Sequence, residues 1–113
     1  MRVLYLLSVF ILVLLSVTEG NAQQCDCTIY PFRPDPPCFS VCMAGLISNI
    51  SEQNARDILG FQPQLAKRVA DLAGKGFQNL EAYGRDMSAA DFRLFENRLR
   101  SLTPSEVDAL RRR

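Results

Sequence analysis

Histidine is absent from the chain, and its absence removes most enzyme templates at once. Without it there is no Ser-His-Asp or Cys-His nucleophile pair, no His-ligated zinc and no attached haem of the C-x-x-C-H kind. A pair of carboxylates in a cleft could still perform acid-base chemistry. Asp86 with Asp91 and Glu106 with Asp108 are available, but they fall at helix-cap or surface positions where acids are common. We predict that the protein is not an enzyme.

A surplus of charge of one sign is also lacking. Lysine and arginine number 13 against 12 for aspartate and glutamate, which gives a formal net charge of +1. Removal of the first 22 residues takes away Arg2 and Glu19 and leaves the net charge at +1. Proteins that attract polyanions over long range carry a strongly basic face. Any contact with nucleic acid would therefore depend on a local cluster of cations.

Residues 1–22 have the composition of a secretory signal peptide. Arg2 supplies a positive start, an apolar-rich stretch runs from Val3 to Val17, and Gly20-Asn21-Ala22 places small residues before a cleavage site. The alternative is an uncleaved membrane anchor, but about 15 residues at about 1.5 Å each reach about 23 Å, short of the roughly 30 Å hydrocarbon core. We expect cleavage, no membrane span in the mature chain, and a secreted or periplasmic location.

The remaining residues, about 91, suffice for one small domain with a marginal hydrophobic core. We divide them into a cysteine- and proline-rich segment, 23–47, and a helical segment, 48–113. In the first segment Pro31, Pro34 and Pro36-Pro37 predict an irregular loop, because proline suppresses both helix and central strand.

Four cysteines flank this loop, as Cys25-Asp26-Cys27 and Cys38-Phe39-Ser40-Val41-Cys42. An even number of cysteines in an exported chain of this size predicts two disulfides. Neighbours in such short motifs seldom bridge each other, so two pairings remain open. They are Cys25 with Cys38 and Cys27 with Cys42, or Cys25 with Cys42 and Cys27 with Cys38. Each bridge would close a loop of roughly 12 to 18 residues and contribute about 3 kcal/mol on the chain-entropy model.

A four-thiolate metal or iron-sulfur site is the alternative use of these cysteines. Their spacing differs from the paired C-x-x-C of zinc ribbons, and an exported protein meets an oxidising environment. We therefore predict no metal and no cofactor.

Helix start and stop signals follow at regular intervals in the second segment. Ser51 predicts the start of a helix that Gly60 ends. Pro63 suits the first position of a second helix, whose apolar residues recur at spacings of three and four until Gly74 ends it.

Three more elements are predicted beyond Gly76. Leu80 to Tyr83 forms a short one. Ser88-Ala89-Ala90-Asp91 resembles a capping box with Asp in place of Glu and starts a helix whose apolar stripe extends to Leu102. Thr103-Pro104-Ser105-Glu106 is a complete capping box for a terminal helix that runs to about Leu110. No period-two run is long enough for a strand, so we predict an all-α fold.

One stretch resembles the helix-hairpin-helix family, and most of all its exported competence-type DNA receptors. The resemblance lies in Asn54-Ala55-x-x-Ile58-Leu59-Gly60-Phe61-Gln62-Pro63-x-x-Ala66-x-x-Val69-x-x-Leu72, followed by Gly76-Phe77-Gln78-Asn79-Leu80-Glu81-Ala82-Tyr83. It covers about residues 48–102, counting a degenerate second copy in which Asp86-Met87-Ser88 stands where a hairpin would. It implies a small helix-hairpin-helix-like bundle of short helices, joined here to a disulfide-stapled proline-rich N-terminal loop.

In that family the backbone N–H groups of the hairpin hold a phosphate, and cations on the second helix support it. On this chain the resemblance implies that role for Gly60, Phe61, Gln62, Lys67 and Arg68. Gln62, however, replaces the hairpin's second glycine, whose missing Cβ allows positive φ and close approach to phosphate. The pair Lys67-Arg68 and the tail Arg111-Arg112-Arg113 concentrate basic charge, yet each also suits a solvated helix face or the negative end of a helix.

Two functions follow from these patterns. The first is non-enzymatic binding of another protein, whose identity the sequence does not reveal, at the cell envelope or outside the cell. The alternative is non-specific DNA binding through Gly60-Phe61-Gln62 and the nearby Lys67 and Arg68. Small net charge favours the first function.

Aromatic residues could serve either function or the core. In the loop from Tyr30 to Pro37, Tyr30 and Phe32, together with Phe39 just beyond it, could form a contact surface, or they could cover the helical core. The aromatics of the helical segment could stack on bases or pack inside; they are Phe61, Phe77, Tyr83, Phe92 and Phe95. In both cases a domain short of core favours packing.

Overall fold

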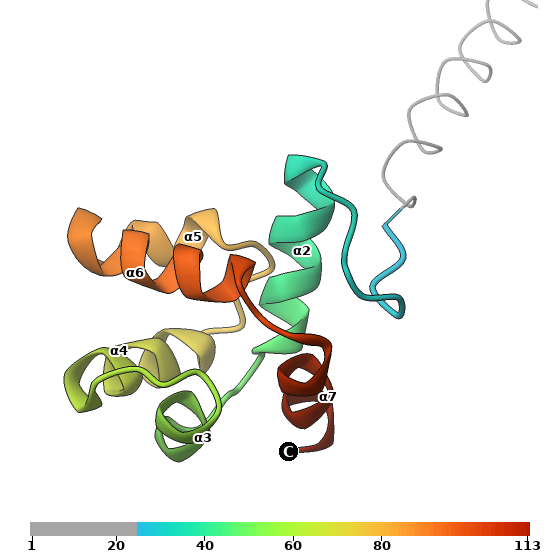
Figure 1. Ribbon diagram of the computed structural model, residues 1–113. Coiled ribbons are helices and arrows are strands. Elements are labelled where there is room, and N and C mark those ends of the chain that lie inside the picture. The colour runs from blue at the N-terminus through green and yellow to red at the C-terminus, as the bar shows by residue number, and fades with distance from the viewer. Residues whose placement is uncertain (1–24) are drawn as a thin grey trace, which may run out of the picture.

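The computed structural model describes residues 25–113, and the predicted signal peptide lies outside this range. The described chain is all-α, as predicted, and contains no strand. Its helices are α2 (Pro36–Leu46), α3 (Glu52–Asp57), α4 (Pro63–Ala73), α5 (Glu81–Gly84), α6 (Ala89–Arg100) and α7 (Pro104–Arg112). Figure 1 shows α3 with α4 and α5 with α6 as two stacked pairs, while α2 and α7 close one end of the bundle.

The helix starts that the sequence predicts are present, and three of them are made by the predicted side-chain caps. Ser51 accepts a hydrogen bond from the N–H of Asn54 and begins α3, and Ser88 accepts from that of Asp91 and begins α6. Thr103 and Glu106 form both halves of the capping box of α7. The short element predicted at Leu80 to Tyr83 is α5, one residue further along the chain. Local cap chemistry thus sets most of these helix boundaries.

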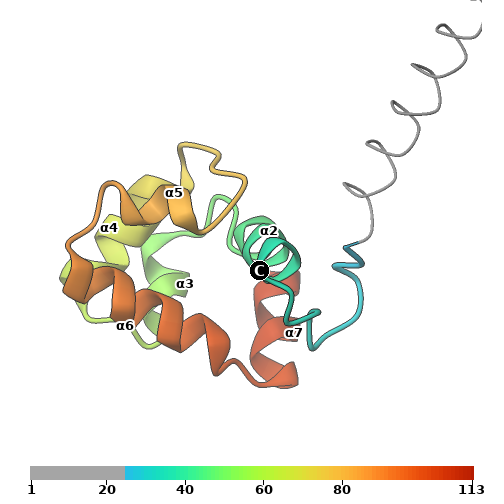
Figure 2. The same cartoon turned by 90° about the horizontal axis from the view of Figure 1, so that it is seen from above.

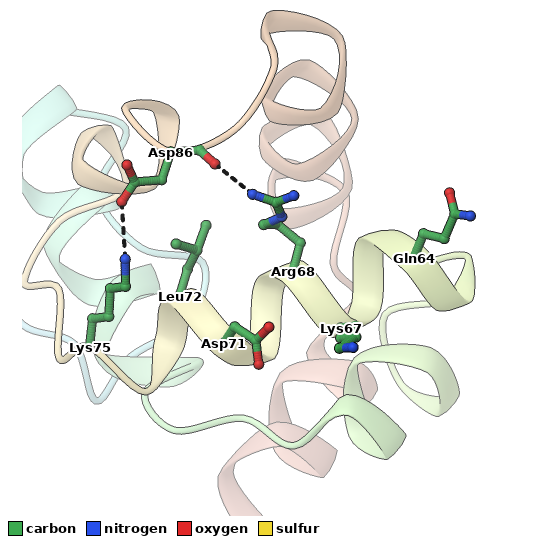
Figure 3. A pocket seen from close by; sticks show the side chains of 7 residues that line it. All are labelled: Gln64, Lys67, Arg68, Asp71, Leu72, Lys75 and Asp86. Atoms are coloured by element: carbon green, nitrogen blue, oxygen red, sulfur yellow. Dashed lines mark hydrogen bonds and ion pairs between the residues drawn. The ribbon is translucent and has the colours of Figure 1, made fainter.

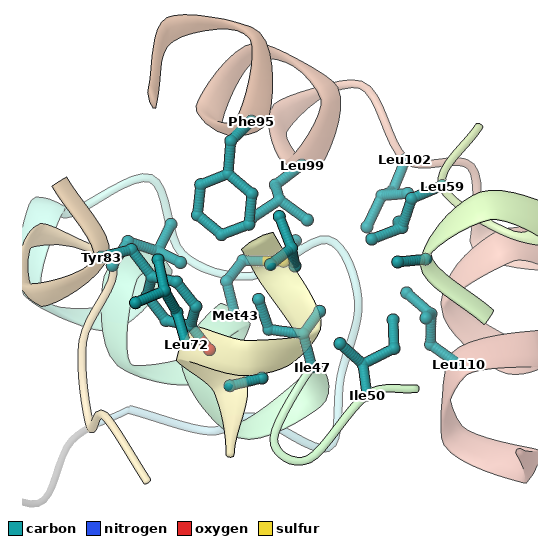
Figure 4. Close-up of a cluster of buried hydrophobic side chains, with 14 of the residues drawn as sticks. Met43, Ile47, Ile50, Leu59, Leu72, Tyr83, Phe95, Leu99, Leu102 and Leu110 are labelled. Carbon is teal, nitrogen blue, oxygen red and sulfur yellow. The ribbon is translucent and has the colours of Figure 1, made fainter. Parts of the chain in front are cut away.

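The core draws side chains from every helix, and Figure 4 shows its centre. Tyr83 and Phe95 are buried there with ring centroids 5.0 Å apart. Phe61, Phe77 and Phe92 pack against this cluster from partly buried positions. The five aromatics of the helical segment therefore serve the core, as a small domain requires.

Both disulfides are formed, and the structure selects one of the two open pairings. Cys25 bonds to Cys38 and Cys27 bonds to Cys42, with Cα–Cα distances of 5.1 and 5.2 Å, inside the usual range for a disulfide. No free cysteine remains. Both bridges attach the proline-rich loop to α2, so the loop is fixed to a helix at two consecutive turns.

Helix α2 is the element that the sequence analysis missed. The prolines predict an irregular loop, and the structure contains this loop. Pro36 and Pro37, however, occupy the first two positions of a helix, where proline is tolerated because these backbone N–H groups have no partner within a helix. Asp35 precedes it without a side-chain cap, and its apolar residues surround the helix instead of forming one stripe. Met43 and Ile47 of α2 are fully buried in the same core as the other helices.

The aromatic rings of the N-terminal loop cover the core, in agreement with the favoured alternative. Phe32 is buried, with 7% of its surface exposed, and Tyr30 donates from its hydroxyl to the carbonyl oxygen of Leu102. Phe39 lies beneath the guanidinium of Arg100, whose Cζ is 4.3 Å from the ring centroid. These rings are therefore not free to form a contact surface.

Arg98 connects three helices through one guanidinium. Its Nε donates to the carbonyl oxygen of Leu59 at 2.8 Å and its Nη2 to that of Ile58 at 3.3 Å, both at the end of α3. The same group pairs with Glu106 in the capping box of α7. The Arg98 side chain lowers the pKa of Glu106, and the backbone N–H of Thr103 adds to this effect.

Candidate functional site

The turn between α3 and α4 is the hairpin to which the resemblance assigns phosphate binding. Gly60 has φ of 73°, a left-handed conformation that favours glycine. The N–H of Gly60 donates to the carbonyl oxygen of Arg56 at 3.0 Å, and that of Phe61 to Ala55 at 3.3 Å. Two of the three backbone donors implied by the resemblance are therefore occupied in closing α3.

The first turn of α4, which follows the hairpin, has no side-chain cap. Gln62 stands at its N-cap with no side-chain hydrogen bond, and Pro63 fills the first helical position. The next two N–H groups, of Gln64 and Leu65, have no partner within the helix because the first turn lacks preceding carbonyls. The backbone N–H groups without a partner in the helix therefore lie at the N-terminal end of α4 and not in the hairpin turn itself.

Lys67 and Arg68 lie on α4 but extend in different directions, as Figure 3 shows. Arg68 donates from Nη1 to the carbonyl oxygen of Asp86 at 3.3 Å, and Nζ of Lys75 lies 3.4 Å from the Asp86 carboxylate. These residues line a groove of about 590 Å³ over Leu72; its other lining residues are Gln64, Lys67 and Asp71. Three cations thus share the groove with two carboxylates, which leaves little excess positive charge.

A smaller groove of about 280 Å³ adjoins the hairpin and joins it to α6. Gln62 and Arg68, two of the residues implied by the resemblance, both line it. Asp91 and Leu94 line its other side. The structure therefore brings Gln62 and Arg68 to one depression and adds an acidic neighbour that would oppose an anion.

The arginine tail folds back onto the protein. Arg111 donates to the carbonyl oxygen of Cys27 at 3.0 Å, and Arg113 donates to those of Leu46 and Ser48 at 3.1 and 2.6 Å. These last two carbonyls lie at or just beyond the C-terminal end of α2, where a cation is favoured. The tail is thus used in fixing α2 and the N-terminal loop.

An exposed face of α2 is a second candidate site, one that the sequence analysis did not identify. Pro37, Val41 and Gly45 lie on it at intervals of one turn, Ser48 continues it, and 46% of the surface of Val41 is exposed. No charged residue occurs between Pro36 and Ser51, and this gap in the charge pattern is the signal that could have found the face.

Two shallow grooves border this face, and Val41 and Gly45 line both. One, of about 230 Å³, runs toward the disulfide-linked loop and includes Phe32, Leu46 and Arg111. The other, of about 340 Å³, runs toward the segment that holds Phe77. The two linings are mostly apolar and contain no carboxylate. Figure 2 shows α2 between the N-terminal loop and the rest of the bundle.

Two further properties describe residues 25–113. No helix among them is both long and apolar enough to cross a bilayer. No cluster of three or more potential metal ligands occurs in the same part of the chain. In comparisons with known proteins, no family model, curated protein or solved structure matches this chain.

Proposed function

We propose that the mature protein is a small non-enzymatic binding module, located in the periplasm or outside the cell, which binds another protein on the exposed face of α2. The observation that carries the proposal is the exposed face of α2 around Val41 and Gly45, which has no charged residue of its own and has a mostly apolar groove on either side. Exposed apolar surface next to grooves is where protein partners gain the most from burial.

The disulfides support the location. Two bridges and no free thiol are compatible with an oxidising compartment, where such bonds persist. The signal peptide predicted at residues 1–22 would deliver the chain there.

The ionisable groups support binding rather than catalysis. Glu106 is held by Arg98 and the cap of α7, Asp108 pairs with Arg112 at 2.7 Å, and Asp86 pairs with Lys75. Each resolved pKa shift moves the pKa of its group further from neutral pH. Hydrogen bonds from Thr28 lower the pKa of Asp26, Arg98 lowers that of Glu106, and burial raises that of Tyr83 to about 12. Acid-base catalysis needs shifts in the opposite sense.

Site-specific photocrosslinking in the native host tests the proposal. A photoreactive residue at position 41 should give a discrete protein adduct, and Gly45→Arg in the same chain should abolish the adduct by placing a charged side chain in the open space at Gly45. A photoreactive residue at Leu94, an exposed apolar position on α6, is the matched control. No adduct at position 41, or equal adducts at both positions, would contradict the proposal.

A second candidate function, non-specific binding of DNA, is favoured by the open first turn of α4. N–H groups at a helix start attract phosphate, and Lys67 and Arg68 lie one turn further on. Four phosphate contacts would make affinity fall about a hundredfold between about 50 and 200 mM salt. In fluorescence anisotropy with a short duplex, Lys67→Ala/Arg68→Ala should weaken binding, while Arg33→Ala on the N-terminal loop should not. Absence of binding at low salt would end this candidate.

A further inference from the structure

One asparagine of the chain lies in the sequence pattern of an N-glycosylation acceptor. Asn49-Ile50-Ser51 matches the pattern of asparagine, any residue except proline, and serine or threonine. Every other asparagine is followed two positions later by a residue that is neither serine nor threonine; these are Asn21, Asn54, Asn79 and Asn97. The chain therefore has a single acceptor pattern of this kind, and the structure describes all of it.

The structure places Asn49 on the surface, in the connection 47–51 between α2 and α3 (Figure 1). Its side chain is exposed, and Ser48 and Ser51 on either side are exposed as well. Asn49 has φ of 55°, a left-handed conformation in which asparagine is enriched among residues other than glycine. A glycan is bulky and needs such a surface position, so Asn49 could carry one without disturbing the core.

The local structure alone does not require this pair of residues. Glycine would suit the positive φ of Asn49 at least as well, and asparagine, aspartate or threonine could cap α3 in place of Ser51. Only asparagine followed two positions later by serine or threonine makes an acceptor. Both requirements are met together at this one exposed connection.

We propose that Asn49 carries an N-linked glycan, added while the chain is exported. The inference goes beyond the proposed function and rests on its export step, across a membrane that holds a lipid-linked oligosaccharide donor and its transferase. The Nδ2 atom of Asn49 forms a bond to the anomeric carbon of the first sugar, and the bond from that carbon to the donor diphosphate breaks. The lipid diphosphate leaves with the electron pair, the amide loses one proton, and no group is oxidised or reduced.

The folded structure requires that transfer comes before folding. The Oγ of Ser51 accepts the N–H of Asn54 at 3.0 Å, and only 2% of the surface of Ile50 between the acceptor residues is exposed. A transferase that must hold Asn49 and the hydroxyl of Ser51 together cannot do so in this arrangement. The core that buries Ile50 includes residues of α6 and α7, which are synthesised later, so the acceptor is accessible during export.

The intact mass of the mature protein purified from its native host tests the inference. The wild type should be heavier than its polypeptide, and peptide N-glycosidase should remove the excess and convert Asn49 to aspartate. Asn49→Gln in the same host should abolish the excess mass completely, because no other acceptor pattern exists in the chain.

Two substitutions at Ser51 separate glycosylation from folding. Ser51→Asp retains a cap for α3 but lacks the hydroxyl of the acceptor pattern, so it should lose the glycan and keep its helical circular dichroism. Ser51→Thr is the matched control, because threonine serves both as cap and as acceptor residue, and it should keep the glycan. A wild type with the mass of the polypeptide alone, or an excess mass that survives Asn49→Gln, would overturn the inference.

The same mass spectrum, taken with the crosslinking experiment, distinguishes this inference from the proposed function. An unmodified chain without residues 1–22 that still gives an adduct at position 41 would reject the glycan and retain the α2 site. A glycosylated chain without that adduct would retain the glycan and reject the α2 site. An unmodified chain with residues 1–22 still attached would reject the glycan together with the export step on which it rests.

Discussion

The N-terminal part of the described chain, from Cys25 through α2, and the body from α3 to α7 are held in place by different means. The first part depends on two disulfides and on burial of a helix without charged residues. In the body, side-chain caps begin α3, α6 and α7, and Arg98 ties α3, α6 and α7 together. The difference shows that two covalent bridges and burial hold a helix that has neither a side-chain cap nor a charged residue. Omitting the charges leaves a face of α2 suited to binding.

Removal of one bridge should have the largest effect. Cys27→Ser/Cys42→Ser opens a loop with a sequence separation of 15, and we expect the free energy of unfolding to fall by about 3 kcal/mol. Cys25→Ser/Cys38→Ser, with a separation of 13, should cost a similar amount. Urea denaturation with circular dichroism measures both. If each double substitution lowered the free energy of unfolding by less than about 1 kcal/mol, the bridges would not be what holds the N-terminal part in place.

Removal of Arg98 should be the next largest effect and is the corresponding test of the body. Arg98→Met keeps much of the side-chain length but leaves the carbonyl oxygens of Ile58 and Leu59 without their donor, so we expect a loss of about 2 kcal/mol. Arg112→Met removes an exposed pair with Asp108 and should cost less than about 0.5 kcal/mol. Equal effects of the two substitutions on urea denaturation would contradict the role given to Arg98.

Alanine at two glycines should shift stability in opposite directions. Gly60→Ala forces a side chain into positive φ and should cost about 1 kcal/mol, although no atom crowds the site. Gly45→Ala, in a helix and also uncrowded, should raise the free energy of unfolding by about 0.5 kcal/mol. A destabilising Gly45→Ala would mean that α2 itself needs the glycine.

Acid should weaken the body through Glu106. Because Arg98 lowers the folded-state pKa of Glu106 below its ordinary value of 4.5, Glu106 contributes stability above that pH and loses it as the pH falls through the folded pKa. Unfolding followed from about pH 6 to pH 3 should therefore show a smaller decline for Glu106→Gln. The lowered pKa of Asp26 also makes stability fall in acid, so the effect of Glu106 is the difference between the variant and the wild type. Identical slopes would contradict this role of Glu106.

The elements of the body could be predicted from the sequence because their signals are local. Ser51, Ser88 and Thr103 each form a cap with a residue three positions later, so both partners lie within one short window. Pro63 likewise begins α4 where its fixed φ suits a helix.

Other features depend on contacts far apart in the chain. Arg113 reaches Leu46 across a sequence separation of 67, and Tyr30 reaches Leu102 across 72. No local pattern indicates that the arginine tail fixes α2, or that Arg68 turns to Asp86 and away from Lys67. Helix α2 was missed for a related reason, since its apolar residues lie all around it and its period is hidden.

Intact mass and disulfide mapping of the protein purified from its native host test the account most directly. We predict a chain that begins after Ala22, takes up alkylating reagent only after reduction, and yields non-reduced peptides that link Cys25 to Cys38 and Cys27 to Cys42. Cleavage before Asp26, before Asp35 and after Phe39 puts the four cysteines on four peptides, so each bridge links its own pair of peptides. Four free thiols, a bound metal ion, or the crossed pairing would contradict the claim that these two bridges hold α2 in place.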